Sequence, residues 1–150
     1  MSIDVTAEIK IGRARGDVAV YATDASNDPL WIGGVVESGV LSDGPVRQGT
    51  RVARVAKFLG KRIEYVNEVI EYDPGVRLVM KSDSGPFPMT ASYEFEEGEG
   101  GTLTQIHVRG EAEGFFKLAA PVLARSVKRS ITRNLETLKG LLEMSEARSG

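Results

Sequence analysis

Arg54, Asn67 and Ser82 are the side chains whose types and spacing best suit the binding of a small polar group. Each falls in a stretch with strand-like alternation, and the stretches are separated by the turn signals "LGKR" and "DPGV". If Gly60-Lys61 is a two-residue hairpin loop, Arg54 lies beside Asn67 on the inward face, and the next turn sets Asn67 beside Ser82. A buried guanidinium needs a partner. The three side chains would therefore anchor a ligand's carboxylate, carbonyl or enolate oxygen.

The same pattern has a simpler explanation, in which Arg54 lies near the edge of the sheet and extends its side chain to water. Tyr65 and Tyr93 also alternate onto the inward face. Each would orient an amphipathic ligand or serve as an ordinary core residue with a bonded hydroxyl. Arg54, Tyr65 and Tyr93 are the catalytic candidates, and the pattern predicts no inward carboxylate or histidine beside them.

Other catalytic and metal-binding chemistries have little support. The chain has no cysteine and one histidine, His107, which alternation places on the outer face. We therefore predict no disulfide, no thiolate catalysis, no metal site and no cofactor. The glycines of "GEGG" lack the lysine and the strand-to-helix setting of a phosphate loop. No serine stands in a nucleophile-elbow pattern.

The positions of these residues depend on a simple order of elements. Residues 3–11 alternate as a half-buried strand, and residues 15–24 have helical spacing. Asn27 or Asp28 would cap a second short helix, which contains Trp31 and ends at a glycine pair.

The rest of the chain predicts a block of strands followed by one long helix. Residues 35–112 alternate between strand patterns and turn signals, and a leucine-rich stripe predicts a helix over residues 115–143. This order favours an α+β fold in which the last helix covers the apolar face of a curved sheet.

Two surface features of these elements could contact a partner. One side of the last helix carries a basic row, most simply a solvated face, with an anionic partner as the alternative: Arg125, Lys128, Arg129 and Arg133. Val66 and Ile70 fall on the predicted outer face of the sheet, which suggests a homodimer contact.

Composition excludes several classes of protein. The length of 150 residues predicts a single domain, 1–150, with a frayed tail at residues 143–150. The net charge of −2 gives no sign of nucleic-acid binding. No apolar run approaches the ~20 residues of a membrane span, and the start lacks a signal-peptide pattern. We expect a cytoplasmic protein with no stable membrane insertion.

Several longer stretches resemble a known superfamily. They are "VYATDASNDPLWIGGV", "GPVRQGTRV", "GKRIEYVNEVIEYDPGVRL", "YEFEEGEGGTLT" and "KLAAPVLARSVKRSITRNLETLKGLLE". Together they resemble the SRPBCC superfamily, the START-like, birch-pollen-allergen-like group, and within it the polyketide cyclase/dehydrase branch. The resemblance implies a helix-grip fold. In that fold a curved antiparallel sheet of about six or seven strands wraps a long C-terminal helix, and two short helices separate the first and second strands.

The resemblance also implies a function. The sheet and the last helix would enclose a cavity that binds a hydrophobic or amphipathic small molecule, such as a lipid, sterol or polyketide. Trp31 would lie at the rim of this cavity or plug the end of the core. The alternatives are a cyclase, aromatase or dehydrase that uses the same cavity, and an accessory or regulatory domain that binds another protein. The expected ligand-binding residues are Trp31, Arg54, Tyr65, Asn67, Met80, Ser82, Phe87, Met89, Tyr93, Ile106, Phe115, Val122 and Leu123.

Overall fold

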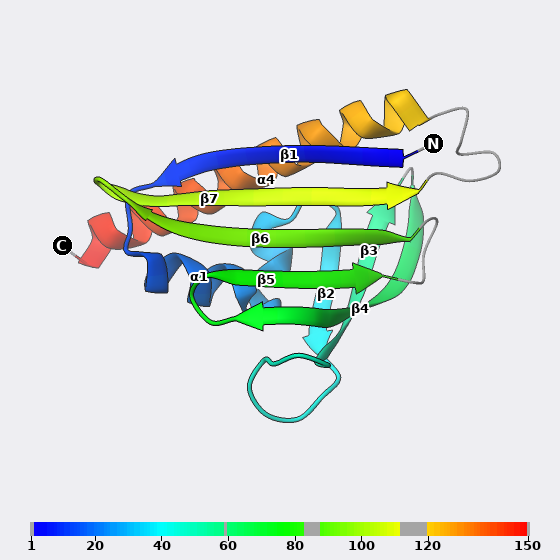
Figure 1. Cartoon of the computed structure of the whole chain (residues 1–150), viewed down its shortest axis with the longest axis horizontal. Coiled ribbons are helices and arrows are strands. Elements are labelled where there is room, and N and C mark those ends of the chain that lie inside the picture. Colours follow the sequence, from blue (N-terminus) through cyan, green and yellow to red (C-terminus); the bar gives the residue numbers. More distant parts are fainter. Residues whose placement is uncertain (1, 59, 83–87, 112–119, 150) are drawn as a thin grey trace.

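The computed structural model describes residues 2–58, 60–82, 88–111 and 120–149 (Figure 1). The expected ligand contacts Phe87 and Phe115 lie outside this described part. Along the chain the elements are β1 (Ser2–Ile11), α1 (Arg15–Thr23), the 3₁₀ helix η1 (Ala25–Asn27), α2 (Asp28–Trp31), β2 (Val35–Val40), β3 (Arg51–Phe58), β4 (Lys61–Asp73), β5 (Arg77–Ser82), β6 (Met89–Gly98), β7 (Gly101–Glu111) and α4 (Ala120–Ser149).

Within the described residues, the strands form one antiparallel seven-stranded sheet in the order β1-β7-β6-β5-β4-β3-β2. In Figure 1, α4 runs along β1. Among the short helices, α1 contacts β6 and β7, whereas η1 and α2 contact β2 at the edge of the sheet. Buried apolar side chains from the sheet, from α1 and α2, and from α4 form the main hydrophobic cluster. This architecture confirms the predicted α+β fold, with a long C-terminal helix and short helices after the first strand.

The alternation of β1 shows how the sequence determines one layer of this fold. Ile3, Ala7 and Ile11 are buried, whereas Asp4 and Glu8 on the opposite face are exposed. Because successive side chains of a strand point to opposite faces, the apolar set meets the core while the carboxylates remain in water.

The register between β4 and β5 is the one predicted. Asn67 pairs with Ser82, and Val69 pairs with Met80. Asn67, Ser82, Val69 and Met80 are all buried, so this hairpin turns the predicted face toward the core.

The register between β3 and β4 differs from the prediction by two residues. Arg54 pairs with Tyr65 rather than with Asn67. Phe58 pairs with Lys61, so the two-residue loop lies one position earlier than expected, with Gly60 as its second residue at φ +77°. Glycine adopts such a positive φ without steric strain. A shift of two residues keeps every side chain on its predicted face but changes its cross-strand neighbour.

Helix α4 packs its apolar stripe on the inner side of the molecule. Ile131, Leu135, Leu138 and Leu142 are buried, as the helical spacing predicts. Residues 115–119 of the predicted helix lie outside the described part. At the other end the helix continues to Ser149, and the frayed tail expected at residues 143–150 stays a prediction.

Hydrogen bonds connect α4 to the segments that follow β1 and α2. The Oδ1 atom of Asn134 accepts a hydrogen bond from the backbone N–H of Gly33 at 2.9 Å. The Nη1 atom of Arg13 donates to the carbonyl of Leu142 at 2.8 Å. These bonds hold the loop after α2 and the chain after β1 against the long helix.

Candidate functional site

A buried ion pair lies on the inner face of the sheet. The Nε and Nη2 atoms of Arg54 contact Oδ2 of Asp28 at 2.9 and 2.8 Å. The hydroxyl of Ser38 donates to the same oxygen at 2.7 Å. The side chains of Arg54 and Asp28 are 8% and 1% exposed. One cation and one anion are therefore held together away from water, where electrostatic interactions are strong.

Three elements bring these residues together. Asp28 is the first residue of α2, where the following proline suits the first helical turn. The pairing of β2 with β3 sets Ser38 opposite Arg54. The predicted capping role of Asn27 or Asp28 is wrong, since α2 has no side-chain cap. Asp28 turns toward Arg54 instead, and the Asn27 amide donates to the carbonyl of Tyr21.

The prediction of an inward face without a carboxylate is therefore also wrong. Asp28 is the functional residue that the strand pattern missed, because it comes from a short helix rather than from the sheet. A signal did exist in the sequence. An inward Arg54 requires a nearby anion, and the short helical segment carries Asp24 and Asp28 as candidates.

Two tyrosines adjoin the ion pair. Tyr65 lies directly across from Arg54 on β4, and Tyr93 is buried on β6. Burial raises the pKa of Tyr93 to about 12, although the charge of Arg54 and a hydrogen bond with it oppose part of this rise. Burial raises the pKa of Tyr65 in the same way. Both hydroxyls are therefore protonated at neutral pH and can donate hydrogen bonds.

The charges of the pair influence each other. Burial raises the pKa of Asp28, while the charge of Arg54 and the hydrogen bond from Ser38 oppose part of this rise. For Arg54, burial disfavours the charged form. The neighbouring Tyr93, Asp28 and Tyr65 outweigh that effect, so the pKa of Arg54 lies above its ordinary value. The guanidinium is therefore charged at neutral pH.

A small internal cavity adjoins the pair. Its volume is only about 10 Å³, which is room for about one water. Its lining residues are Ala22, Thr23, Ala25, Asp28, Val46, Val52, Arg54, Val69, Leu78, Met80 and Tyr93.

The position of this cavity differs from the expected one. We expected a cavity between the sheet and the last helix, but no lining residue comes from α4. The buried side chains of Ile131 and Leu135 belong to the hydrophobic core instead. The cavity lies between the sheet, the α1–η1 segment and the loop that contains Val46.

Trp31 is part of the core. Its side chain is 3% exposed and belongs to the main hydrophobic cluster. The centre of its ring system lies 5.9 Å from the Tyr93 ring, with the ring planes inclined by 60°. Its Nε1 atom has no hydrogen-bond partner among the described residues. Trp31 therefore contacts Tyr93, which lines the cavity, but does not line the cavity itself and is not exposed at a rim.

The structure brings some of the remaining predicted ligand contacts to the inner face and leaves others apart. Asn67, Met80, Ser82 and Ile106 are buried, whereas Met89 and Leu123 are half-buried. Val122 is 65% exposed on α4 and so does not join the buried set. Since the β3–β4 register is shifted, Arg54 does not stand directly beside Asn67.

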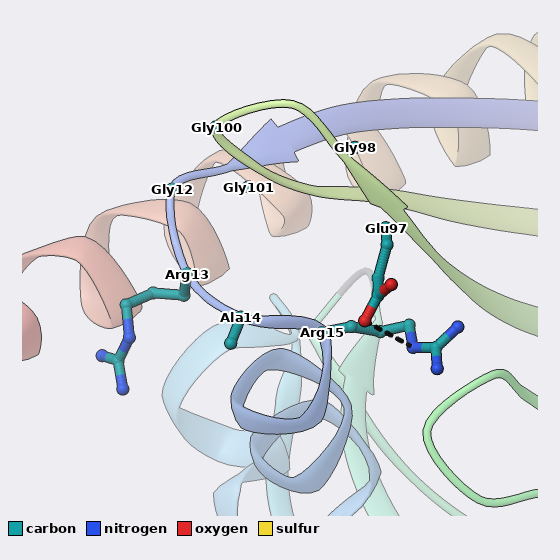
Figure 2. Close-up of a pocket in the computed structure, with 8 residues that line it drawn as sticks. All are labelled: Gly12, Arg13, Ala14, Arg15, Glu97, Gly98, Gly100 and Gly101. Atoms are coloured by element: carbon teal, nitrogen blue, oxygen red, sulfur yellow. Dashed lines mark ion pairs between the residues drawn. The ribbon is translucent and has the colours of Figure 1, made fainter.

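A larger hollow opens at the surface, where β1 joins α1 beside the β6–β7 hairpin (Figure 2). Its volume is about 410 Å³. Much of its lining is glycine backbone, and Figure 2 shows Arg13 directed away from the hairpin. Arg15 forms a loose ion pair with Glu97 at 4.0 Å. This hollow has few side chains for specific recognition, so the buried pair is the better candidate site.

The outer surface carries the other predicted features. His107 lies on the outer face, as predicted, and its Nε2 is 2.6 Å from Oδ1 of Asp4. Ile70 is 39% exposed on the same face, and Val66 is half-buried.

The residues of the basic row on α4 are all exposed, and Lys128 donates to the carbonyl of Thr6. Among the described residues, no group of three or more acidic or histidine side chains could hold a metal ion. In the same part of the chain, no helix has the length and apolar character of a membrane span.

Comparisons with solved structures show the same fold over nearly the whole chain. The protein TTHA0849 from Thermus thermophilus is 21% identical, with a TM-score of 0.79, over 95% of this chain and 98% of that one. A START superfamily protein from Mycobacterium smegmatis is 12% identical, with a TM-score of 0.78, over 94% and 97%. The Zhui aromatase/cyclase from Streptomyces sp. R1128 is 13% identical, with a TM-score of 0.77, over 95% and 94%.

The sequence itself places the chain in a family. Among curated proteins, no relative matches it. Residues 2–143, however, match the family described as polyketide cyclase/dehydrase and lipid transport. This match confirms the resemblance found in the sequence, and the START-like neighbours agree with it. The chain therefore belongs to the polyketide cyclase/dehydrase and lipid transport family.

Proposed function

We propose that the chain binds a hydrophobic or amphipathic small molecule in the cavity beside Arg54. The observation that carries this proposal is the ion pair of Arg54 and Asp28, which borders an apolar cavity together with Tyr93. Ligand sites combine an apolar wall with a few well-placed polar groups. The lining of this cavity has that composition, and the family includes lipid transport in its description.

The ion pair is not what a stable core requires. Well-packed apolar residues of similar volume stabilise a core as well as a buried ion pair does, or better. Arg54 and Asp28 therefore contribute something other than packing. A fixed cluster of hydrogen-bonding groups within an apolar surface would orient a bound molecule.

Binding requires the cavity to expand, because it now has room for about one water. Met80 lines the cavity and has a flexible side chain that adapts to different shapes. Val46 is half-buried and packs against the core from the loop between β2 and β3. We propose that a ligand occupies the space these two side chains vacate.

Native mass spectrometry of the protein purified from its own host tests this proposal. We expect a retained small molecule, and we expect aromatic ketones to quench Trp31 fluorescence, because Trp31 packs on Tyr93. Val52→Phe should block binding by filling the cavity. Val55→Phe, on the other face of the same strand, is the matched control. Absence of a retained ligand and flat titrations across a broad panel would contradict the proposal.

A second candidate function is a cyclase-type reaction in the same cavity. The specific observation is the buried carboxylate of Asp28, a titratable group beside a guanidinium and two tyrosine hydroxyls. In such a reaction Asp28 would take the proton from the carbon next to a ketone. Arg54 would stabilise the enolate oxygen. A similar fold occurs in the Zhui aromatase/cyclase. Incubation with a poly-β-ketone analogue should yield a cyclised product that the Asp28→Asn variant fails to form.

A further inference from the structure

We infer that Asp28 sets the charge preference of the cavity, so that the site selects an uncharged ligand with an acceptor oxygen, such as a ketone, over a carboxylate of the same shape. This inference rests on the proposed function and specifies its ligand class. The sequence alone predicts that Arg54 anchors acidic as well as neutral groups. The structure shows that its charge already has a partner.

The first argument is the balance of charge. Among the described residues that line the cavity, Arg54 and Asp28 carry the charges at neutral pH, and their charges cancel. A ligand carboxylate placed beside Arg54 would bring two anions against one cation in a medium of low polarity. Like charges at such distances repel strongly, and the carboxylate would also lose its hydration. An uncharged ketone has neither cost.

The second argument is the position of the neighbouring charges. Asp24 lies close enough to raise the pKa of Asp28 through its own negative charge. The side chain of Asp24 caps η1 at the same end of the short helical segment. Asp24 is exposed and does not line the cavity, so it adds to this repulsion much less than Asp28 does.

The third argument is the balance of hydrogen-bond donors and acceptors. A guanidinium has five N–H groups and no acceptor. The Nε and Nη2 atoms of Arg54 both contact the same oxygen of Asp28. Ser38 donates to that oxygen as well, so this carboxylate atom has three donor groups around it. Arg54 also hydrogen-bonds the hydroxyls of Tyr65 and Tyr93. Tyr93 lines the cavity, and its hydroxyl keeps its own O–H as a donor, which suits a carbonyl oxygen.

A matched pair of probes tests the inference by isothermal titration calorimetry at neutral pH. The probes are 2-acetylnaphthalene, a ketone, and 2-naphthoate, a carboxylate of similar size. We expect the wild-type protein to bind the ketone about tenfold or more tightly than the carboxylate, because the carboxylate alone meets the repulsion of Asp28 and loses its hydration. The Asp28→Asn variant leaves Arg54 without its anion. It should reverse this preference.

Two control variants distinguish the explanations. Asp24→Asn removes a nearby exposed charge but leaves the ion pair, and it should change the preference much less than Asp28→Asn. The double variant Asp28→Asn/Arg54→Gln carries neither charge. It should keep a preference for the ketone. If Asp28→Asn alone does not fold, which non-cooperative unfolding would reveal, the double variant takes its place in the test.

Each outcome has a definite meaning. A wild-type protein that binds both probes equally, or prefers the carboxylate, would overturn the inference and leave the proposed binding function intact. The same follows if a folded Asp28→Asn variant keeps the wild-type preference. Failure of the wild-type protein to bind either probe, together with absence of a retained ligand from the host, would overturn both the inference and the proposed function.

Discussion

Arg54 and Asp28 stand 26 residues apart in the sequence, yet two nitrogens of the guanidinium contact one carboxylate oxygen of Asp28 within 2.9 Å. The contact joins β3 to the first turn of α2, and Ser38 on β2 donates to the same oxygen. The pair thereby holds the short helix against the sheet at the wall of the cavity. Its removal should affect stability as well as ligand binding.

Arg54→Met should lower the free energy of unfolding by about 3–5 kcal/mol, because it leaves Asp28 as an uncompensated buried charge. The double variant Asp28→Leu/Arg54→Met should recover most of that loss. Guanidinium chloride denaturation measures both effects. Arg51→Met on the same strand is the control, since Arg51 is exposed, and it should change stability by no more than about 0.5 kcal/mol. Equal losses in the single and double variants would contradict the explanation that Arg54→Met leaves Asp28 as an uncompensated charge.

The raised pKa of Tyr93 predicts that the protein loses stability at alkaline pH. This pKa is about 12 in the folded protein against an ordinary value of 10.0. The unfolded chain therefore releases this proton first, and the free energy of unfolding falls as the pH rises from about 10 to about 12. A two-unit difference corresponds to roughly 2–3 kcal/mol. Denaturation curves across this window should show a smaller fall in the Tyr93→Phe variant. An identical fall would mean that Tyr93 is not buried as described.

The hydrogen bond between Asn134 and Gly33 should stabilise the packing of α4 against the loop after α2. The Oδ1 atom of Asn134 accepts the Gly33 N–H at 2.9 Å from a buried position. Asn134→Ala should cost about 0.5–1.5 kcal/mol, because the exposed Gly33 exchanges its protein acceptor for water. Hydrogen exchange at Gly33 should become faster. The control is Thr137→Ala, on an exposed part of the same helix, which should leave exchange at Gly33 unchanged. Slow exchange at Gly33 in both variants would show that another group holds this N–H.

Features that depend on local periodicity could be predicted from the sequence. The alternation of Ile3, Ala7 and Ile11 placed β1 correctly, and the spacing of Leu135, Leu138 and Leu142 identified the buried side of α4. In both cases the side chains that face the core follow directly from the geometry of one element. The burial of Arg54 and Tyr93 could be predicted for the same reason.

Features that depend on contacts between elements could not be predicted. The β3–β4 register depends on which position of the loop Gly60 occupies, and either position suits a glycine. The partner of Arg54 depends on how α2 lies on the sheet, which no local pattern specifies. Residues of α1 and η1 line the cavity, whereas Ile131 and Leu135 of α4 belong to the core. Each of these depends on tertiary packing.

A substitution at Gly101 tests how closely the β6–β7 hairpin approaches β1. A Cβ atom at this position would lie 2.2 Å from the carbonyl oxygen of Ile11, and the residue has φ +158°. Neither backbone segment can move away without breaking the pairing of β1 with β7, which joins Ile11 to Thr102. Gly101→Ala should therefore lower the free energy of unfolding by about 2 kcal/mol or more.

The matched control is Gly98→Ala at the other side of the same hairpin. There an added Cβ would have its closest neighbour at 3.8 Å, an ordinary van der Waals distance. This variant should keep nearly the wild-type midpoint in guanidinium chloride, because alanine also reduces the freedom of the unfolded chain. The difference between the two midpoints thus measures the effect of the close approach between the backbones of Gly101 and Ile11. Equal midpoints would place the end of β1 farther from the hairpin, and the surface hollow between them would then be wider than described.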